Sequence, residues 1–269
     1  MYKMEVKGLS KSYEVEGKRH IVLEDINLKI MEGQFVSLLG PSGCGKTTLL
    51  TIMGGFQRPD RGEVFLEGKK VEKPGPERAF VFQNYALFPW MTVKENILYP
   101  LKKQRISKKE QDERLEELLN LVNLKGKENL YPHQLSGGMK QRTAVARGLA
   151  PRPQVLLMDE PLGALDFQMR KTMQEEMEQI FIKDKTTVIM VTHDVEEAVY
   201  LSDRIIVMSS ARGTIIEDLV LNDERPRNRM SSAYRSKVNY LMEVLRRAVK
   251  GEFNKEGGIT EEERRCLVV

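Results

Sequence analysis

The stretch QFVSLLGPSGCGKTTLLTIM, residues 34–53, decides the fold class of this chain. An apolar run leads into GPSGCGKT at residues 40–47, which fits the pattern G-x-x-x-x-G-K-[ST], and a helix-forming run follows. Glycines let the backbone curl so that its N–H groups and the helix N-terminus point at a phosphate, while Lys46 bridges phosphate oxygens and Thr47 is placed to bind Mg²⁺. A strand and a helix flank the loop as the motif requires, so the sequence predicts a phosphate-binding site rather than an ordinary glycine-rich turn.

Two more apolar runs, QVLLMDE at 154–160 and TTVIMVTH at 186–193, have the nearly continuous hydrophobicity of strands covered on both faces. Each run ends in polar residues, which is typical of a parallel sheet with ligands beyond the carboxyl ends of its strands. Residues 3–8, 21–30 and 63–68 instead alternate apolar and polar residues, as half-exposed antiparallel strands do. The sequence therefore predicts an α/β fold with mixed sheets.

Helical patterns occupy the region between these strands. Ser107 and Glu110 form a capping box ahead of leucines with helical spacing, and a second helix is expected from Ser136 to Ala150, where prolines end it. Near the end of the chain, the basic link RPRNRM at 225–230 leads to a helix over 233–249, and a charged tail that we expect to be mobile follows.

Composition limits the possible classes of protein. The chain has 269 residues, of which 41% are hydrophobic and 30% charged, and no apolar run approaches the length of a membrane-spanning helix. Its net charge of +4 does not indicate nucleic acid as a partner. The first 18 residues lack the features of a secretory signal, and two cysteines, Cys44 and Cys266, predict neither a disulfide framework nor a zinc site. Residues 266–269 formally fit a prenylation box, but a frayed tail is the better interpretation.

The run at 154–160 ends in two adjacent carboxylates, Asp159 and Glu160. The first suits the coordination of Mg²⁺ and the second suits a general base that polarises water. Buried strands often end in solvated acids, so this pair alone has little specificity. Together with the phosphate loop, it indicates nucleotide hydrolysis.

The string LSGGMKQR at 135–142 completes a set of motifs that resembles the ATP-binding cassette (ABC) ATPases, whose signature sequence it matches. Ser136 and the amides of Gly137 and Gly138 lie at a predicted helix N-terminus, where free N–H groups and the helix dipole favour a γ-phosphate. An isolated SGG is equally compatible with a simple helix cap, so the resemblance depends on the other motifs and on their order.

Four other elements follow the order of that family. Tyr13 resembles the aromatic residue that stacks on adenine, Gln83 resembles the Q-loop glutamine, and His193 resembles the switch histidine. Residues 163–166, GALD, resemble the D-loop, with Gly163 where the family more often has serine. Taken singly, these residues are an ordinary packed tyrosine, a surface glutamine and a structural histidine. The resemblance covers residues 2–222.

The resemblance implies a P-loop NTPase fold with a RecA-like mixed sheet, an antiparallel β subdomain and an inserted α-helical subdomain. The expected nucleotide-binding domain is 1–222 with the insert at about 84–153, and 223–269 forms a C-terminal helix and tail. Implied catalytic residues are Lys46, Gln83, Glu160 and His193, and implied Mg²⁺ ligands are Thr47, Gln83 and Asp159. The implied ATP-binding residues are Tyr13, Gly40, Pro41, Ser42, Gly43, Cys44, Gly45, Lys46, Thr47, Thr48, Ser136, Gly137 and Gly138.

A single chain with one set of motifs holds two half-sites, so the resemblance implies a head-to-tail homodimer that encloses two ATP molecules. It also implies membrane permease subunits as partners, a solute-binding protein as an indirect partner, and a peripheral position on the cytoplasmic face of the cell membrane.

The segment ALFPWMTVKENI at 86–97 gives the indication of import. Pro89-Trp90 resembles the nitrate, sulfonate and taurine importers, whereas many sugar, polyamine and metal importers have Pro-His there; a local hydrophobic anchor is the alternative role for Trp90. Arg225-Pro226-Arg227 again resembles the first group. Sugar-importer cassettes usually append a regulatory domain of about a hundred residues, and the roughly 45 residues after the core here disfavour allosteric sensing by such a domain. An exporter cassette and a soluble ABC ATPase of translation or DNA repair are the alternative classes.

Overall fold

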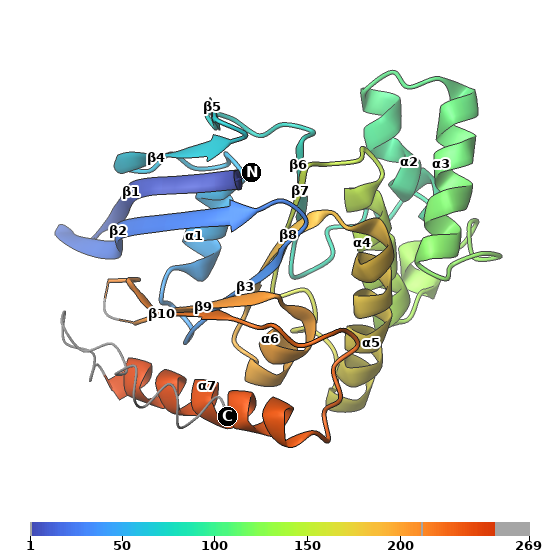
Figure 1. Ribbon diagram of the computed structural model, residues 1–269. Helices are drawn as coiled ribbons and strands as arrows, with labels where there is room; N and C mark the ends of the chain where they lie inside the picture. The colour runs from blue at the N-terminus through green and yellow to red at the C-terminus, as the bar shows by residue number, and fades with distance from the viewer. Residues whose placement is uncertain (1, 211, 251–269) are drawn as a thin grey trace. The chain divides into compact units, whose positions relative to one another are not determined.

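The computed structural model describes residues 2–210 and 212–250 (Figure 1). The chain divides into two compact units. Unit 1 consists of residues 1–74 and 187–269, and unit 2 of residues 75–186. The predicted mobile tail and Cys266 lie outside the described residues. No helix within the described ranges is both long and apolar enough to cross a bilayer.

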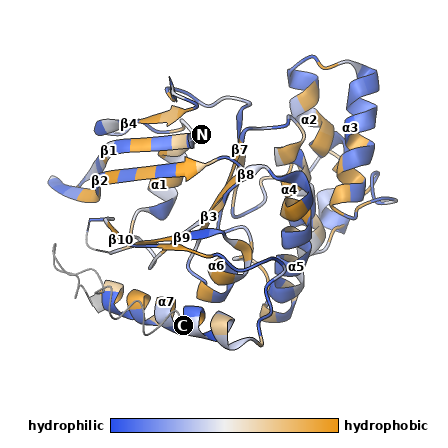
Figure 2. Cartoon of the chain, viewed as in Figure 1, coloured by the Kyte–Doolittle hydropathy of each residue, from blue (hydrophilic) through white to orange (hydrophobic). Residues whose placement is uncertain are grey.

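An antiparallel sheet forms the N-terminal part of unit 1, in the order β2-β1-β4-β5. The strands are β1 (Tyr2–Val15), β2 (Lys18–Met31), β4 (Arg61–Leu66) and β5 (Lys69–Lys70). Figure 2 shows the alternation of hydrophobic and hydrophilic residues along β1 and β2. This alternation buries residues such as Met4 and Val6 on one face, as the sequence predicted. Both long strands continue beyond the predicted ranges to form an extended hairpin.

A second sheet of unit 1 contains the strand that precedes the phosphate loop. The strands of this sheet that belong to unit 1 are β3 (Phe35–Leu39), β8 (Thr187–Thr192), β9 (Arg204–Met208) and β10 (Ile215–Val220), and β3 lies parallel to both β8 and β9. Every residue of β3 and β8 is buried, which explains their continuous apolar sequences. Helices α1 (Lys46–Met53) and α6 (Val195–Leu201) leave the carboxyl ends of β3 and β8.

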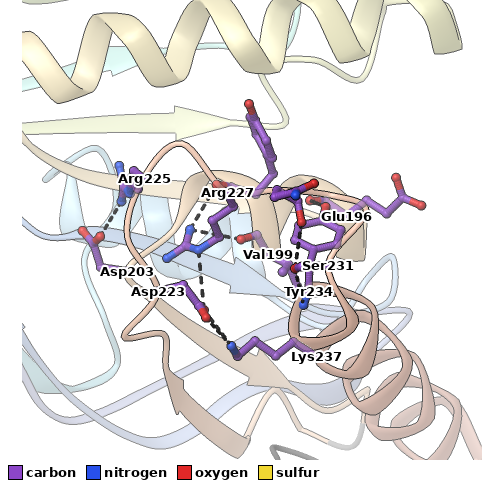
Figure 3. Close-up of polar contacts among 11 residues, drawn as sticks. Glu196, Val199, Asp203, Asp223, Arg225, Arg227, Ser231, Tyr234 and Lys237 are labelled. Atoms are coloured by element: carbon purple, nitrogen blue, oxygen red, sulfur yellow. Dashed lines mark hydrogen bonds and ion pairs between the residues drawn. The ribbon is translucent and has the colours of Figure 1, made fainter.

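The C-terminal helix α7 (Ser232–Lys250) is part of unit 1, where it contacts α6 and β9. The buried Arg227 guanidinium donates hydrogen bonds to the carbonyl oxygens of Val199 and Tyr200 at the end of α6, at 3.1 and 3.0 Å (Figure 3). The hydroxyl of Tyr234 donates to the carbonyl oxygen of Glu196, and burial raises the pKa of Tyr234 to about 12. The basic link predicted from the sequence therefore secures the helix that follows His193.

Unit 2 combines two parallel strands with helices. Strands β6 (Arg78–Val81) and β7 (Val155–Asp159) pair in parallel, and the helices are α2 (Val93–Lys103), α3 (Lys108–Leu121), the 3₁₀ helix η1 (Pro132–Gln134), α4 (Gly137–Leu149) and α5 (Phe167–Asp184). The capping box of Ser107 and Glu110 at the start of α3 is confirmed, and Ser136 caps α4 as predicted. A second capping box, of Thr92 and Glu95, begins α2.

Candidate nucleotide site and partner groove

Two glycines give the phosphate loop its curl. Gly43 and Gly45 have φ angles of +80° and +97°, in the left-handed region that favours glycine. A Cβ added to Gly45 would lie 2.8 Å from Cδ2 of Leu23 and 2.9 Å from the carbonyl oxygen of Val22, whereas one added to Gly43 would meet no atom within 4 Å. Position 45 therefore requires glycine because the loop backbone passes close to β2. Position 43 requires glycine only because of its φ angle.

Lys46 lies folded over this loop. The side chain is buried, and Nζ donates hydrogen bonds of 2.8 Å to the carbonyl oxygens of both Gly40 and Pro41. Cys44 is also buried, and burial raises the pKa of its thiol despite the opposing ammonium of Lys46. The neutral thiol acts as a buried packing group within the loop, while Lys46 supplies a cationic side chain there.

The register of β3 and β8 brings His193 beside the loop. Leu39 pairs with Thr192, so Gly40 and His193 leave neighbouring strand ends, and the side chain of His193 is exposed. The hydroxyl of Thr192 bonds to the buried carboxylate of Glu197, and Thr192 Oγ1 accepts a hydrogen bond of 3.0 Å from the backbone N–H of Asp194. These contacts fix the turn that carries His193, and neither Thr192 nor Glu197 was singled out by the sequence motifs.

In unit 2, the residues Gln83 and Glu160 converge. The parallel register pairs Val81 with Met158, which carries both residues to the same end of the two strands. A Cβ placed on Gly163 would lie 3.4 Å from Nε2 of Gln83 and 3.5 Å from Oε2 of Glu160. Glu160 has a φ of +42°, a strained conformation for a residue with a side chain, and such strain is concentrated at functional sites.

The signature sequence forms the start of α4, also in unit 2. Ser136 Oγ accepts a hydrogen bond of 3.3 Å from the N–H of Met139, and the first turn contains no acidic residue. A Cβ on Gly137 would lie 2.8 Å from Cδ2 of Leu165, so a side chain would require Leu165 to move. The helix dipole therefore has no acidic partner in its own first turn, which favours an anion there.

The structure places the predicted site residues in two groups. Unit 1 contains the loop, Tyr13 and His193, and unit 2 contains Gln83, Asp159, Glu160 and the signature residues 136–138. The three proposed Mg²⁺ ligands are distributed over both units, and their joint role stays a prediction.

A groove of about 440 Å³ opens on unit 2. Phe88, which lines it, has its ring centroid 4.7 Å from that of Tyr99 and 5.6 Å from that of Trp90. Trp90 is 69% exposed although its ring contacts that of Phe88, and the choice between a partner contact and a local hydrophobic anchor stays a prediction. The lining is mostly apolar and aromatic: Pro76, Ala79, Phe80, Phe82, Ala86, Phe88, Tyr99, Pro100, Gln104, Arg147, Gly148 and Pro151.

Residues 23–163 match the family model described as ABC transporter. The chain belongs to the ABC transporter family. It is 46% identical to an uncharacterized ABC transporter ATP-binding protein of Methanocaldococcus jannaschii, over 92% of this chain and 94% of the relative. It is 41% identical to the aliphatic sulfonates import ATP-binding protein SsuB of Bacillus subtilis, over 91% and 92% of the two chains. It is 44% identical to the nitrate import ATP-binding protein NrtD of Synechococcus elongatus, over 78% of each.

The dimeric, post-hydrolysis structure of an ATP-binding cassette bound to ADP and Pi is similar, with a TM-score of 0.70 and 33% identity. The match covers 82% of this chain and all of that one. This cassette is therefore an ATP-hydrolysing enzyme with the ABC ATPase fold, as the sequence predicted.

The sequence motifs missed Arg147, which connects the groove of the cassette to its signature helix. From α4, Arg147 donates hydrogen bonds of 2.9 and 2.7 Å to the carbonyl oxygens of Tyr85 and Ala86, and burial lowers its pKa. Tyr85 and Ala86 have φ angles of +62° and +44°, so Arg147 holds a strained turn just after Gln83. The sequence signal that could have indicated Arg147 is the recurrence of arginine along the helix predicted over residues 136–150.

Asn96 was missed in the same region. Its fully buried amide donates to the carbonyl oxygens of Phe88, Met91 and Thr92, and accepts from the N–H of Phe88. The loop that carries Trp90 is therefore fixed from inside the unit.

Proposed function

We propose that this cassette is the ATP-hydrolysing subunit of an ABC importer, acting as a homodimer on MgATP and driving transport of a small oxyanion through separate membrane subunits. The apolar groove is the observation that supports this proposal most. Its aromatic lining adjoins the turn held by Arg147, so an occupant of the groove would act on the backbone next to Gln83.

The proposed ATP site uses the phosphate loop for binding. The N–H groups of residues 40–48 and the N-terminus of α1 attract phosphate oxygens, and Lys46 leaves its carbonyl partners to bridge β- and γ-phosphate. Tyr13 stacks on the adenine base. Thr47, Gln83 and Asp159 offer the hydroxyl, amide and carboxylate oxygens that Mg²⁺ prefers, and Mg²⁺ when bound neutralises charge on the phosphates.

For hydrolysis, Glu160 accepts a proton from the attacking water, and His193 contacts the γ-phosphate. Ser136 and the amides of Gly137 and Gly138 come from the second copy and stabilise charge on the γ-phosphate at their helix N-terminus. Two identical sites then form across a two-fold axis.

The proposed occupant of the groove is an apolar helix of a membrane permease, which places the cassette peripherally on the cytoplasmic face of the membrane. Nitrate and sulfonates are named for two relatives at 44% and 41% identity. These names and the resemblance at Pro89-Trp90 support the assignment of a nitrate-, sulfonate- or taurine-like solute, delivered to the permease by a solute-binding protein.

The test is reconstitution of the cassette with its permease in liposomes. We expect ATP hydrolysis to be stimulated by a binding protein loaded with one of these oxyanions, and no stimulation by any of them would contradict the solute assignment. Trp90→Glu should prevent co-purification with the permease, whereas Met230→Glu, at a comparably exposed residue of unit 1, should not. Equal co-purification of both variants would contradict the proposed role of the groove region.

A further inference from the structure

Tyr13 lies in the part of the β1–β2 hairpin that β4 does not reach. The pairing of β1 with β4 ends at Ser10 and Arg61, whereas the pairing with β2 continues through Tyr13 and His20 to Val15. A two-stranded ribbon is only marginally stable in water. The position of Tyr13 therefore depends on contacts outside the two strands.

The loop between α1 and β4 supplies those contacts. Gln57 Oε1 accepts a hydrogen bond of 2.8 Å from the hydroxyl of Tyr13, which is 36% exposed. Because α1 begins at Lys46 and this loop leaves its other end, one continuous element runs from the phosphate loop to the hydroxyl of Tyr13.

Asp60, the residue just before β4 begins, continues the support beyond that strand. Its carboxylate accepts hydrogen bonds from the backbone N–H and the hydroxyl of Ser12, at 2.8 and 2.6 Å, and from Nζ of Lys11 at 3.1 Å. Its own N–H donates to the carbonyl oxygen of Ser10 at 2.9 Å. Asp60 thus holds the three residues that precede Tyr13 in the way that a neighbouring strand would.

Lys11 adds a third contact. Its Nζ donates to the carbonyl oxygen of Arg58 at 3.0 Å and lies 5.5 Å from the centroid of the Tyr13 ring. Gln57 therefore holds the hydroxyl of Tyr13, and the ammonium of Lys11 lies near its ring. Asp60 holds the backbone that precedes it.

We infer that Gln57 and Asp60 are positioning residues that hold the Tyr13 ring ready to stack on the adenine base. The inference rests on the proposed ATP site and extends it to a loop outside the family motifs. Positioning of the base must affect nucleotide binding and leave the binding of a bare phosphate chain unchanged, since only the nucleotide carries the base.

The experiment compares dissociation constants for magnesium ATP and magnesium tripolyphosphate, measured by calorimetry on the full chain. Gln57→Ala and Asp60→Asn should weaken ATP binding about 3- to 10-fold, as expected for loss of one aromatic stack, with tripolyphosphate binding unchanged. Gln57→Glu keeps an acceptor for the Tyr13 hydroxyl, so this variant should bind ATP with the affinity of the wild-type chain. Glu63→Gln, at an exposed β4 carboxylate paired with Lys70, is the matched control and should change neither constant.

Tyr13→Ala separates this inference from the proposed site. If Tyr13→Ala leaves ATP affinity unchanged, the stacking role in the proposed function is wrong. If Tyr13→Ala selectively weakens ATP but Gln57→Ala and Asp60→Asn do not, the positioning role is overturned. An equal loss of affinity for both ligands would also overturn it, because the loop would then support the phosphate site or the fold.

Discussion

Gln83 and Glu160 approach each other at Gly163, where an added Cβ would lie 3.4 Å from Nε2 of the first and 3.5 Å from Oε2 of the second. Gln83 lies between Phe82 and Ala86, which both line the groove, and Glu160 follows the strand that ends in Asp159. The absence of a side chain on Gly163 leaves room between the amide and the carboxylate. A displacement of the groove-lining residues on either side of Gln83 would therefore reach Glu160, the proposed general base, through Gln83.

Glu160→Gln should separate binding from hydrolysis. The amide keeps the size of the side chain but cannot accept a proton from water, so turnover should fall at least ~10²-fold. ATP affinity should remain and the dimer should persist with ATP bound. Phosphate release, ATP binding and light scattering measure these three quantities. Near-normal hydrolysis would remove Glu160 from the role of general base.

Gly45→Ala and Gly43→Ala should differ although both residues have left-handed φ angles. Both substitutions carry a backbone strain of about 1 kcal/mol. Only the Cβ at position 45 also meets Leu23 and the backbone of Val22, at 2.8 and 2.9 Å. We expect Gly45→Ala to lower the free energy of unfolding by at least about 1 kcal/mol more than Gly43→Ala, measured by urea denaturation. Equal losses would contradict the close approach of the loop to β2.

Periodicity and motifs predicted what depends on local sequence. The alternation in β1 and β2, the capping box at Ser107 and the cap at Ser136 are features in which a few neighbouring residues determine the backbone, and all are present. The ABC family and its ATPase activity were also predicted, because ordered motifs have high specificity.

Contacts between distant segments could not be predicted in this way. Arg147 reaches carbonyl oxygens more than sixty residues away, and Gln57 meets Tyr13 across 44 positions. Arg227 appeared as part of a basic link, yet it is buried against the end of α6. A sequence pattern shows that a side chain is polar, but only the fold decides which backbone groups it satisfies.

Arg147→Met should destabilise unit 2 by leaving two backbone acceptors without their donor. Loss of two hydrogen bonds from a charged group and the exposure of a strained turn correspond to about 2–4 kcal/mol of unfolding free energy. Arg235→Met, at an exposed position of α7, is the control and should change stability by less than about 0.5 kcal/mol. Chemical denaturation measures both. A loss at Arg147 no greater than that at Arg235 would contradict the bracing of the turn after Gln83.

Asp60→Asn should show a stability difference that disappears in acid. The hydroxyl of Ser12, followed by the ammonium of Lys11, lowers the pKa of Asp60 from 3.8 to about 2 in the folded chain. A carboxylate whose folded pKa is depressed contributes stability above its ordinary pKa and loses it as pH falls toward the folded value. The wild-type chain should therefore have a higher melting temperature than Asp60→Asn at pH 6, and the difference should shrink between pH 4 and pH 2. Glu63→Gln should show a smaller difference at pH 6, because Glu63 pairs only with an exposed lysine. A constant difference between wild type and Asp60→Asn down to pH 2 would mean that the charge of Asp60 does not hold the hairpin that carries Tyr13.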